Sequence, residues 1–170
     1  MRIIVTGGCG FIGSAFIRHI INNTNFSVLN IDNQTYAANK HALKEVESDE
    51  RYSFNKMNIC SGDLIYKLMC EFQPNALVNF AAESHVDNSI DSPGVFLKTN
   101  IIGTYQLLEA SLRYFKLNNF TSREQFIFHH ISTDEVYGDI KKNDLPASEV
   151  TKYAPNSPYS ASKASSDHLV

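Results

Sequence analysis

Two adjacent carboxylates follow a strand-like run in the last third of the chain. The segment ISTDEVYG, residues 131–138, places Asp134 and Glu135 after Thr133, downstream of the apolar residues 126–128. Solvated turn residues or a helix cap would account for two such acids in an arbitrary sequence. In a dry site, however, the mutual repulsion of neighbouring carboxylates separates their pKa values, so that one can act as a base and the other as an acid.

A tyrosine and a lysine stand one helical turn apart further along the chain. Tyr159 and Lys163, in YSASK, occupy positions i and i+4 and share one helix face. A phenol with a pKa of about 10 is a poor base at neutral pH, but a neighbouring ammonium favours the phenolate and lowers that pKa. The pair could therefore abstract a proton, although an incidental pair on a solvated helix has the same spacing.

A glycine-rich turn follows the first strand-like run. VTGGCGFIG fits both Gly8-x-Gly10-x-x-Gly13 and Gly7-x-x-Gly10-x-x-Gly13. Glycines permit a tight turn and let a pyrophosphate approach the backbone, while the following helix offers N–H groups to the anion. Asp32 ends the next strand-like run and would accept hydrogen bonds from an adenosine ribose. No Arg follows Asp32 directly, which favours NAD over NADP.

The composition argues against several classes of protein. The chain has 170 residues and a net charge of -3, without the basic runs typical of nucleic-acid or membrane surfaces. Its apolar runs are far shorter than the ~20 residues of a membrane span, and Met1 leads directly into a strand, so a cytoplasmic protein is expected. The three cysteines lack metal-ligand spacing, so no disulfide framework and no metal site is predicted. We interpret Cys9 as a small filler in preference to a nucleophile.

Strand-like runs alternate with helix-length segments along the chain. They are apolar at consecutive positions, as in strands of a parallel sheet that is covered on both faces. These runs are residues 2–6, 27–32, 52–58, 75–81 and 125–132. The pattern predicts an α/β fold, a Rossmann-type doubly wound parallel sheet with strand order 3-2-1-4-5.

The remaining segments predict helices and one long loop. Residues 11–22 and 91–115 read as helices, the second opening with Asp-Ser-Pro and carrying apolar residues at helical spacing. Residues 139–158 are polar and contain three prolines, so we expect them to line or cover a site. A last helix has no cap where the chain stops. We therefore expect residues 1–170 to form an NAD-binding domain, and a C-terminal substrate domain to lie outside this chain.

These motifs resemble the extended short-chain dehydrogenase/reductase family. The resemblance rests on the glycine pattern, on Asn100 followed by Gly103 and Thr104, on a Ser/Thr pair at a strand end and on Tyr159-x-x-x-Lys163. It implies NAD as cofactor, a sugar nucleotide as substrate, and a homodimer built on the 91–115 helix and the Tyr159 helix. In this family the tyrosine deprotonates a sugar hydroxyl, and the lysine also holds the nicotinamide ribose.

The triplet Thr133-Asp134-Glu135, with TYAAN, AAESHVD and YSASKASSDHLV, is similar to the branch of that family that removes water from dTDP-glucose. This similarity implies that Tyr159 takes the C4 hydroxyl proton, Glu135 takes the C5 proton, Asp134 protonates the departing C6 hydroxyl, and Thr133 hydrogen-bonds the sugar near O4. A UDP-glucose dehydratase, a 4-epimerase or a decarboxylase of the same family remains an alternative, although the acid pair argues against the epimerase and the decarboxylase. A truncated nucleotide-binding module without activity is a third reading.

The resemblance also implies cofactor contacts at individual positions. Besides Gly7, Gly10, Gly13, Tyr159 and Lys163, these are Phe11 and Ile12 for the pyrophosphate, Asp32, Asn33, Gln34 and Thr35 for the adenosine ribose, Asn58 and Ile59 for the adenine, Phe80, Ala81 and Ala82 for the inner half, and Thr99 for the nicotinamide side. Ser84 would face both cofactor and substrate.

Overall fold

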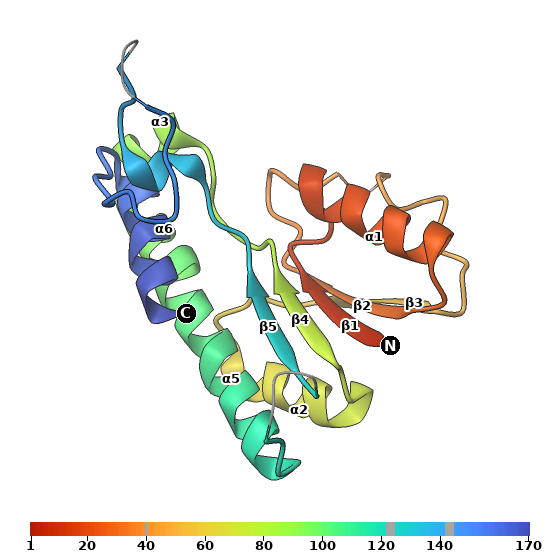
Figure 1. Ribbon diagram of the computed structural model, residues 1–170. Helices are drawn as coiled ribbons and strands as arrows, with labels where there is room; N and C mark the ends of the chain where they lie inside the picture. The colour runs from red at the N-terminus through yellow and green to blue at the C-terminus, as the bar shows by residue number, and fades with distance from the viewer. Residues whose placement is uncertain (40, 122–124, 142–144) are drawn as a thin grey trace.

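Five parallel strands form the centre of the fold in the order β3-β2-β1-β4-β5 (Figure 1). Their bounds are β1 Arg2–Thr6, β2 Ser27–Asp32, β3 Tyr52–Lys56, β4 Ala76–Asn79 and β5 Ile127–His130. The computed structural model describes residues 1–39, 41–121, 125–141 and 145–170. The predicted fold class and strand order are confirmed. Three strands are shorter than predicted, and β3 ends where its last residue, Lys56, pairs with the last residue of β2, Asp32.

The two faces of the sheet bury different side chains. Helix α1 (Phe11–Asn23) packs on the face that carries Ile3 and Val5, whereas α2 (Gly62–Phe72) and α5 (Thr104–Leu117) pack on the face that carries Ile4. Successive residues of a strand point to opposite faces, so burial of both faces requires the consecutive apolar residues seen in RIIVT.

The helix predicted over residues 91–115 is formed from residue 93 onward and continues to residue 117. Helix α3 (Val86–Asp91) stops before Ser92, α4 (Pro93–Phe96) starts a new helix, and a π-helical segment, η1 (Leu97–Gly103), leads into α5. The prediction of one long helix is therefore confirmed, except that the helix starts at Pro93 and not at Asp91, which ends α3. The residue before a proline avoids the helical conformation, and Ser92 has φ -139° and ψ 63°. π-Helical turns often occur at functional sites.

Helix α6 (Pro158–Leu169) packs against α3, α4, η1 and α5. It starts with a capping box: the Ser157 hydroxyl accepts from the Ser160 backbone N–H, and the Ser160 hydroxyl accepts from the Ser157 N–H. The described part of the predicted loop, residues 139–141 and 145–157, contains no helix or strand, and residues 142–144 of that prediction lie outside the described residues. Within the described ranges, no helix is long and apolar enough to cross a membrane.

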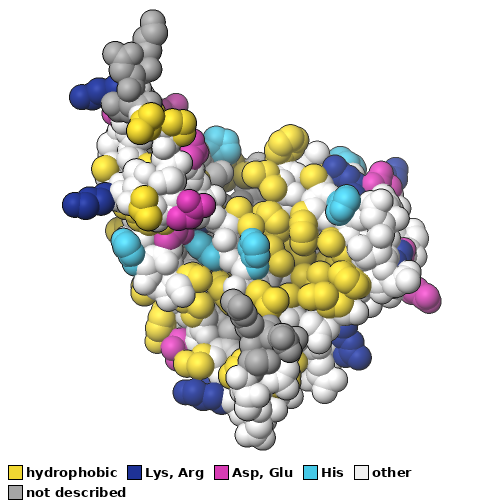
Figure 2. Space-filling model, viewed as in Figure 1, with side chains coloured by type: hydrophobic (Ala, Val, Ile, Leu, Met, Phe, Trp, Pro, Cys, Tyr) yellow, Lys and Arg dark blue, Asp and Glu magenta, His cyan; other side chains and the backbone are white. Residues whose placement is uncertain are grey.

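Part of the α1 side of the sheet remains open to solvent among the described residues. Helix α1 packs on β1 and β2, while Ile127 at the start of β5 is 44% exposed. Figure 2 shows hydrophobic side chains, in yellow, gathered beside α1 and over the neighbouring part of the sheet.

Candidate active site

The carboxyl ends of the strands border a cavity of about 590 Å³. Its wall comes from the glycine turn after β1, from the ends of β2 and β4, from η1 and from α6. The wall contains every residue predicted to contact the cofactor except Gln34: Gly7, Gly10, Phe11, Ile12, Gly13, Asp32, Asn33, Thr35, Asn58, Ile59, Phe80, Ala81, Ala82, Ser84, Thr99, Tyr159 and Lys163. The structure thus brings these residues together, and their contact with a cofactor stays a prediction.

The glycine turn has backbone geometry that larger residues would disturb. Gly7 has φ +70°, and a Cβ added to Gly13 would lie 2.4 Å from the carbonyl oxygen of Gly7. Gly10, at the N-cap of α1, has no side chain to cap the helix, so the first N–H groups of α1 remain available to an anion. Phe11 and Ile12 in that first turn are 91% and 62% exposed.

Asp32 holds the neighbouring backbone in place. Its Oδ2 accepts from the Cys9 backbone N–H at 2.8 Å, and its Oδ1 accepts from the Gln34 backbone N–H at 2.6 Å. Gln34 therefore contacts the Asp32 carboxylate through its backbone, although it does not line the cavity. Burial first, and then the charge of Asp32, raise the pKa of the Cys9 thiol. This shift favours the interpretation of Cys9 as a filler, because a thiol with a raised pKa is a poor nucleophile.

The acid pair lies at the end of β5, beside the cavity and outside its wall. Residues 134–137 form a short 3-10 helix, η2 (Asp134–Tyr137), and the Thr133 hydroxyl caps it by accepting from the Glu135 backbone N–H at 3.3 Å. Asp134 is exposed and Glu135 is half-buried. Ser132 lines the cavity, whereas Thr133, Asp134 and Glu135 do not. The described residues alone therefore do not provide the dry environment expected for the two acids.

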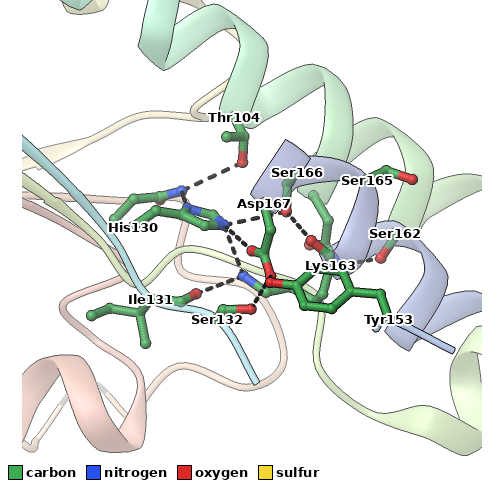
Figure 3. A network of polar contacts seen from close by, with 12 residues as sticks. Thr104, His130, Ile131, Ser132, Tyr153, Ser162, Lys163, Ser165, Ser166 and Asp167 are labelled. Atoms are coloured by element: carbon green, nitrogen blue, oxygen red, sulfur yellow. Dashed lines mark hydrogen bonds and ion pairs between the residues drawn. The ribbon is translucent and has the colours of Figure 1, made fainter. Parts of the chain in front are cut away.

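Tyr159 and Lys163 are both buried on one face of α6. Burial raises the pKa of Tyr159, with Glu135 and Asp134 adding to the rise and a hydrogen bond with Thr133 opposing it. The predicted lowering of this pKa by Lys163 is therefore wrong. The Lys163 ammonium instead donates to the Ile131 carbonyl oxygen at 2.6 Å and lies 3.2 Å from His130 Nε2 (Figure 3).

Sequence reasoning missed the polar cluster around Lys163. His130 at the end of β5 contacts Asn79 through Nδ1 at 3.1 Å and Ser166 through Nε2 at 3.2 Å. Asp167 accepts hydrogen bonds from Ser132 and from Tyr153 (Figure 3). The i+4 spacing from Lys163 to Asp167 was a signal in the sequence, whereas only the fold brings His130 to the same place.

Two further residues, Tyr36 and Asn100, make contacts at the rim of the cavity that the sequence did not reveal. The Tyr36 hydroxyl, on the loop after β2, donates to Glu83 at 3.0 Å and lies 3.3 Å from His85 Nδ1, on the segment after β4. Asn100 of η1 accepts from the Glu83 backbone N–H at 2.9 Å and donates to the Ser162 hydroxyl at 2.8 Å. Glu83, His85 and Lys98 also line the cavity.

The cations and metal ligands of this region are few. Lys98 and Lys163 are the only Lys or Arg residues among the described residues of the cavity wall. In the ranges that the structure describes, no group of three or more His, Cys, Asp or Glu side chains is placed to hold a metal ion.

The fold and this site define a Rossmann-type nucleotide-binding domain of the extended short-chain dehydrogenase/reductase class. Within that class, residues 4–170 match the GDP-mannose 4,6 dehydratase family, and the chain belongs to it.

Individual relatives narrow the comparison. The chain is 54% identical to a dTDP-glucose 4,6-dehydratase of Shigella flexneri, over 100% of this chain and 49% of that protein. It is 53% identical to one of Neisseria meningitidis serogroup B, over 99% and 48%. Among solved structures, DesIV, the dTDP-glucose 4,6-dehydratase of Streptomyces venezuelae with NAD and TYD bound, superposes with a TM-score of 0.87 at 38% identity, over 99% of this chain and 50% of that one. The chain spans about half the length of the curated relatives it matches.

Proposed function

We propose that the intact protein carrying this chain is an NAD-dependent dTDP-glucose 4,6-dehydratase, a hydro-lyase. The observation that carries the proposal is the triplet Thr133-Asp134-Glu135 at the end of β5, beside a cavity lined by Tyr159 and Lys163. Relatives named dTDP-glucose 4,6-dehydratase that are 51% to 54% identical over the whole chain support it.

The cavity fits a dinucleotide such as NAD. Its volume of about 590 Å³ is in the range of cofactor sites. The glycine turn and the first turn of α1 would hold the pyrophosphate. Each oxygen of Asp32 accepts one backbone hydrogen bond and keeps lone pairs for the adenosine ribose hydroxyls. No Arg among the described residues lines the cavity, which favours a ribose without a 2′-phosphate.

We assign the other residues of the cavity wall to the two halves of the cofactor. Asn58 and Ile59 would meet the adenine, Phe80, Ala81 and Ala82 the inner half, and Ser84, Thr99, Tyr159 and Lys163 the nicotinamide half. Bound NAD would take a hydride from C4 of the sugar and return it at C6, and its positive charge would favour ionisation of a nearby phenol.

Oxidation requires a base for the C4 hydroxyl, which we assign to Tyr159. The phenol needs a nearby positive charge for this role, because burial raises its pKa. Thr133 hydrogen-bonds Tyr159 and lowers that pKa, and its hydroxyl would also contact the sugar near O4. The resulting C4 ketone makes the C5 proton acidic, which is the condition for the next step.

Elimination requires a base at C5 and an acid at C6. We assign the base to Glu135 and the acid to Asp134, so that the C5 proton moves to Glu135, the C6 hydroxyl leaves with a proton from Asp134, and one water is released. The cap that Thr133 provides fixes the start of η2 and keeps both carboxylates at the end of β5.

Two features of the intact protein belong to the same proposal. The relatives are about twice as long as this chain, so we assign the nucleotide of the substrate to the part of such proteins that these residues do not match. We also propose a homodimer through the apolar surface of α4, η1 and α5. Its exposed residues include Val95, Leu97, Ile102, Tyr105 and Leu112.

An epimerase is the main rival within the same class. The chain is 30% identical to a UDP-glucose 4-epimerase of Thermotoga maritima, with a TM-score of 0.81. Epimerisation at C4 needs no base and acid for loss of water, so the acid pair favours dehydration.

Turnover by the intact protein tests the proposal. We expect dTDP-glucose to be converted to dTDP-4-dehydro-6-deoxy-glucose, seen by mass spectrometry as the loss of one water and by NMR as a C6 methyl group. UDP-glucose is the comparison substrate, since none of the assigned contacts reads the base. Formation of the C4 epimer without loss of water would favour the epimerase, and absence of any conversion would contradict the proposal.

A further inference from the structure

The ammonium group of Lys163 is buried where α6 meets the end of β5. The residue is 3% exposed, and Nζ contacts the Ile131 carbonyl oxygen and His130 Nε2. Neither contact supplies a negative charge. Burial first, and then Lys163, lower the pKa of His130 to about 4, so that this ring is neutral at physiological pH. A buried ammonium is costly unless a carboxylate compensates for it.

Asp167 brings a carboxylate to this place from the next turn of α6. Tyr159, Lys163 and Asp167 follow one another at intervals of four residues and share one face of the helix. The Ser132 and Tyr153 hydroxyls both donate to Oδ2 of Asp167, Tyr153 at 3.1 Å (Figure 3). These two donors hold the carboxylate from outside α6.

The other carboxylate oxygen of Asp167, Oδ1, lies on the side of His130 and Lys163. Oδ1 of Asp167 is buried, has no hydrogen-bond partner among the described residues, and lies 3.4 Å from His130 Nε2. The same nitrogen lies 3.2 Å from Lys163 Nζ. Neutral His130 can accept from the ammonium or donate to the carboxylate, depending on its tautomer. Asp167 therefore compensates the charge of Lys163 without forming a direct ion pair that would draw Nζ away from Ile131.

We propose that Asp167 is a positioning residue, which keeps the ammonium of Lys163 charged and directed at the end of β5 so that Lys163 can hold the nicotinamide ribose of a bound cofactor. The consequence for turnover rests on the proposed function, whereas the effect on the charge of Lys163 does not. Burial lowers the pKa of Lys163 to about 8, and Asp167 is the group that opposes this shift.

The other titratable groups around Lys163 come from several elements. They are His130 of β5, Asp134 and Glu135 of η2, Tyr153 of the loop before α6, Tyr159 of α6, and Lys98 of η1 on the same cavity wall. Asp134 and Glu135 of η2 raise the pKa of Tyr159, whereas Asp167 raises the pKa of both Tyr159 and Lys163.

The test compares Asp167→Asn with Asp167→Glu in the intact protein. Asn keeps the shape and the acceptor but removes the charge, so we expect the pKa of Lys163 to fall by about 1 to 3 units. Carbon-13 NMR of labelled lysine side chains measures this pKa directly, and Lys163→Gln identifies the signal. The alkaline limb of the pH profile for dTDP-glucose turnover should move down with it. Asp167→Glu keeps the negative charge, so the pKa of Lys163 and the alkaline limb should both stay close to those of the original protein. Glu71→Gln, which removes an exposed charge from α2, should change neither the pKa nor the pH profile.

The outcomes separate the inference from the proposed function. An unchanged titration of Lys163 in Asp167→Asn would overturn the inference, whatever turnover shows. A shifted titration in a protein that does not convert dTDP-glucose would leave the inference standing and contradict the function. If Asp167→Asn does not fold, Tyr153→Phe tests the same claim, because it frees the carboxylate from one of its two donors. A fall in the pKa of Lys163 in Tyr153→Phe, smaller than the roughly 1 to 3 units expected for loss of the Asp167 charge, would support the inference. No fall would overturn it.

Discussion

The Lys163 ammonium donates a hydrogen bond of 2.6 Å to the carbonyl oxygen of Ile131 and thereby ties α6 to the end of β5. Ile131 stands two residues before Thr133, and Tyr159 stands one helical turn before Lys163. Together with the hydrogen bonds between His130 and Ser166 and between Ser132 and Asp167, this contact holds the proposed C4 base in place relative to the proposed elimination residues. Lys163 has a geometric role at the strand end in addition to any effect on the phenol.

Tyr159→Phe should stop the first step of the reaction. Phenylalanine keeps the buried ring and removes the proton acceptor, so we expect C4 oxidation to slow by roughly 10²- to 10⁴-fold. Single-turnover formation of NADH after addition of dTDP-glucose measures this step. Tyr66→Phe, on α2 away from the cavity, is the matched control and should keep the original rate. NADH formation at the normal rate in Tyr159→Phe would assign the base to another residue.

The sheet and most of the cavity wall could be predicted from local patterns. Consecutive apolar residues, as in RIIVT, indicate a strand buried on both faces, and a sheet of such strands gathers its carboxyl ends along one edge. Gly7, Asp32 and Phe80 follow different strands and meet there for that reason. The resemblance to a known family then added residues such as Asn58 and Thr99, which no local pattern marks.

The features that sequence reasoning missed depend on packing between distant segments. Pro93 marked the start of the long helix to within two residues, but the apolar spacing did not reveal the π-helical segment η1 within it. The direction of the Lys163 side chain had no local signal, because Ile131 and His130 reach it only through the packing of α6 on the end of β5. For the same reason, the raised pKa of Tyr159 could not be inferred from its spacing to Lys163.

Gly13→Ala should disrupt the glycine turn. The added Cβ would lie 2.4 Å from the Gly7 carbonyl oxygen, and backbone must move to relieve this contact. We expect a loss of about 1 to 3 kcal/mol in the free energy of unfolding and weaker binding of NAD. Urea denaturation and calorimetry with NAD measure the two effects.

Gly94→Ala is the control for this substitution, since a Cβ at Gly94 meets no atom within 4 Å. It should leave NAD binding unchanged and should not reduce stability, because alanine is favoured over glycine in a helix. Equal losses in the two variants would contradict the role assigned to Gly13.

His130→Gln should make the protein less sensitive to acid. The pKa of His130 is lowered from 6.5 to about 4, so between these values the unfolded chain binds a proton that the folded protein does not. Stability is therefore lost as the pH falls through this window, by about 2 kcal/mol between pH 7.5 and pH 5. Urea denaturation at both pH values should show a smaller loss in His130→Gln.

His41→Gln removes an exposed histidine and should keep the acid loss of the original protein. If His130→Gln loses as much stability in acid as the original protein does, His130 is not the group that takes up the proton on unfolding.

The central claim is that Tyr159 serves oxidation at C4 and Glu135 serves the elimination of water. Glu135→Gln in the intact protein tests this claim most directly. Glutamine keeps the shape of the side chain and removes the base, so C4 oxidation should proceed while loss of water stops. After mixing with dTDP-glucose, the absorbance of NADH should rise and persist, and mass spectrometry should find no dehydrated product. Formation of the 4-dehydro-6-deoxy product at the original rate, without persistent NADH, would contradict the assignment of Glu135 as the base that drives the elimination.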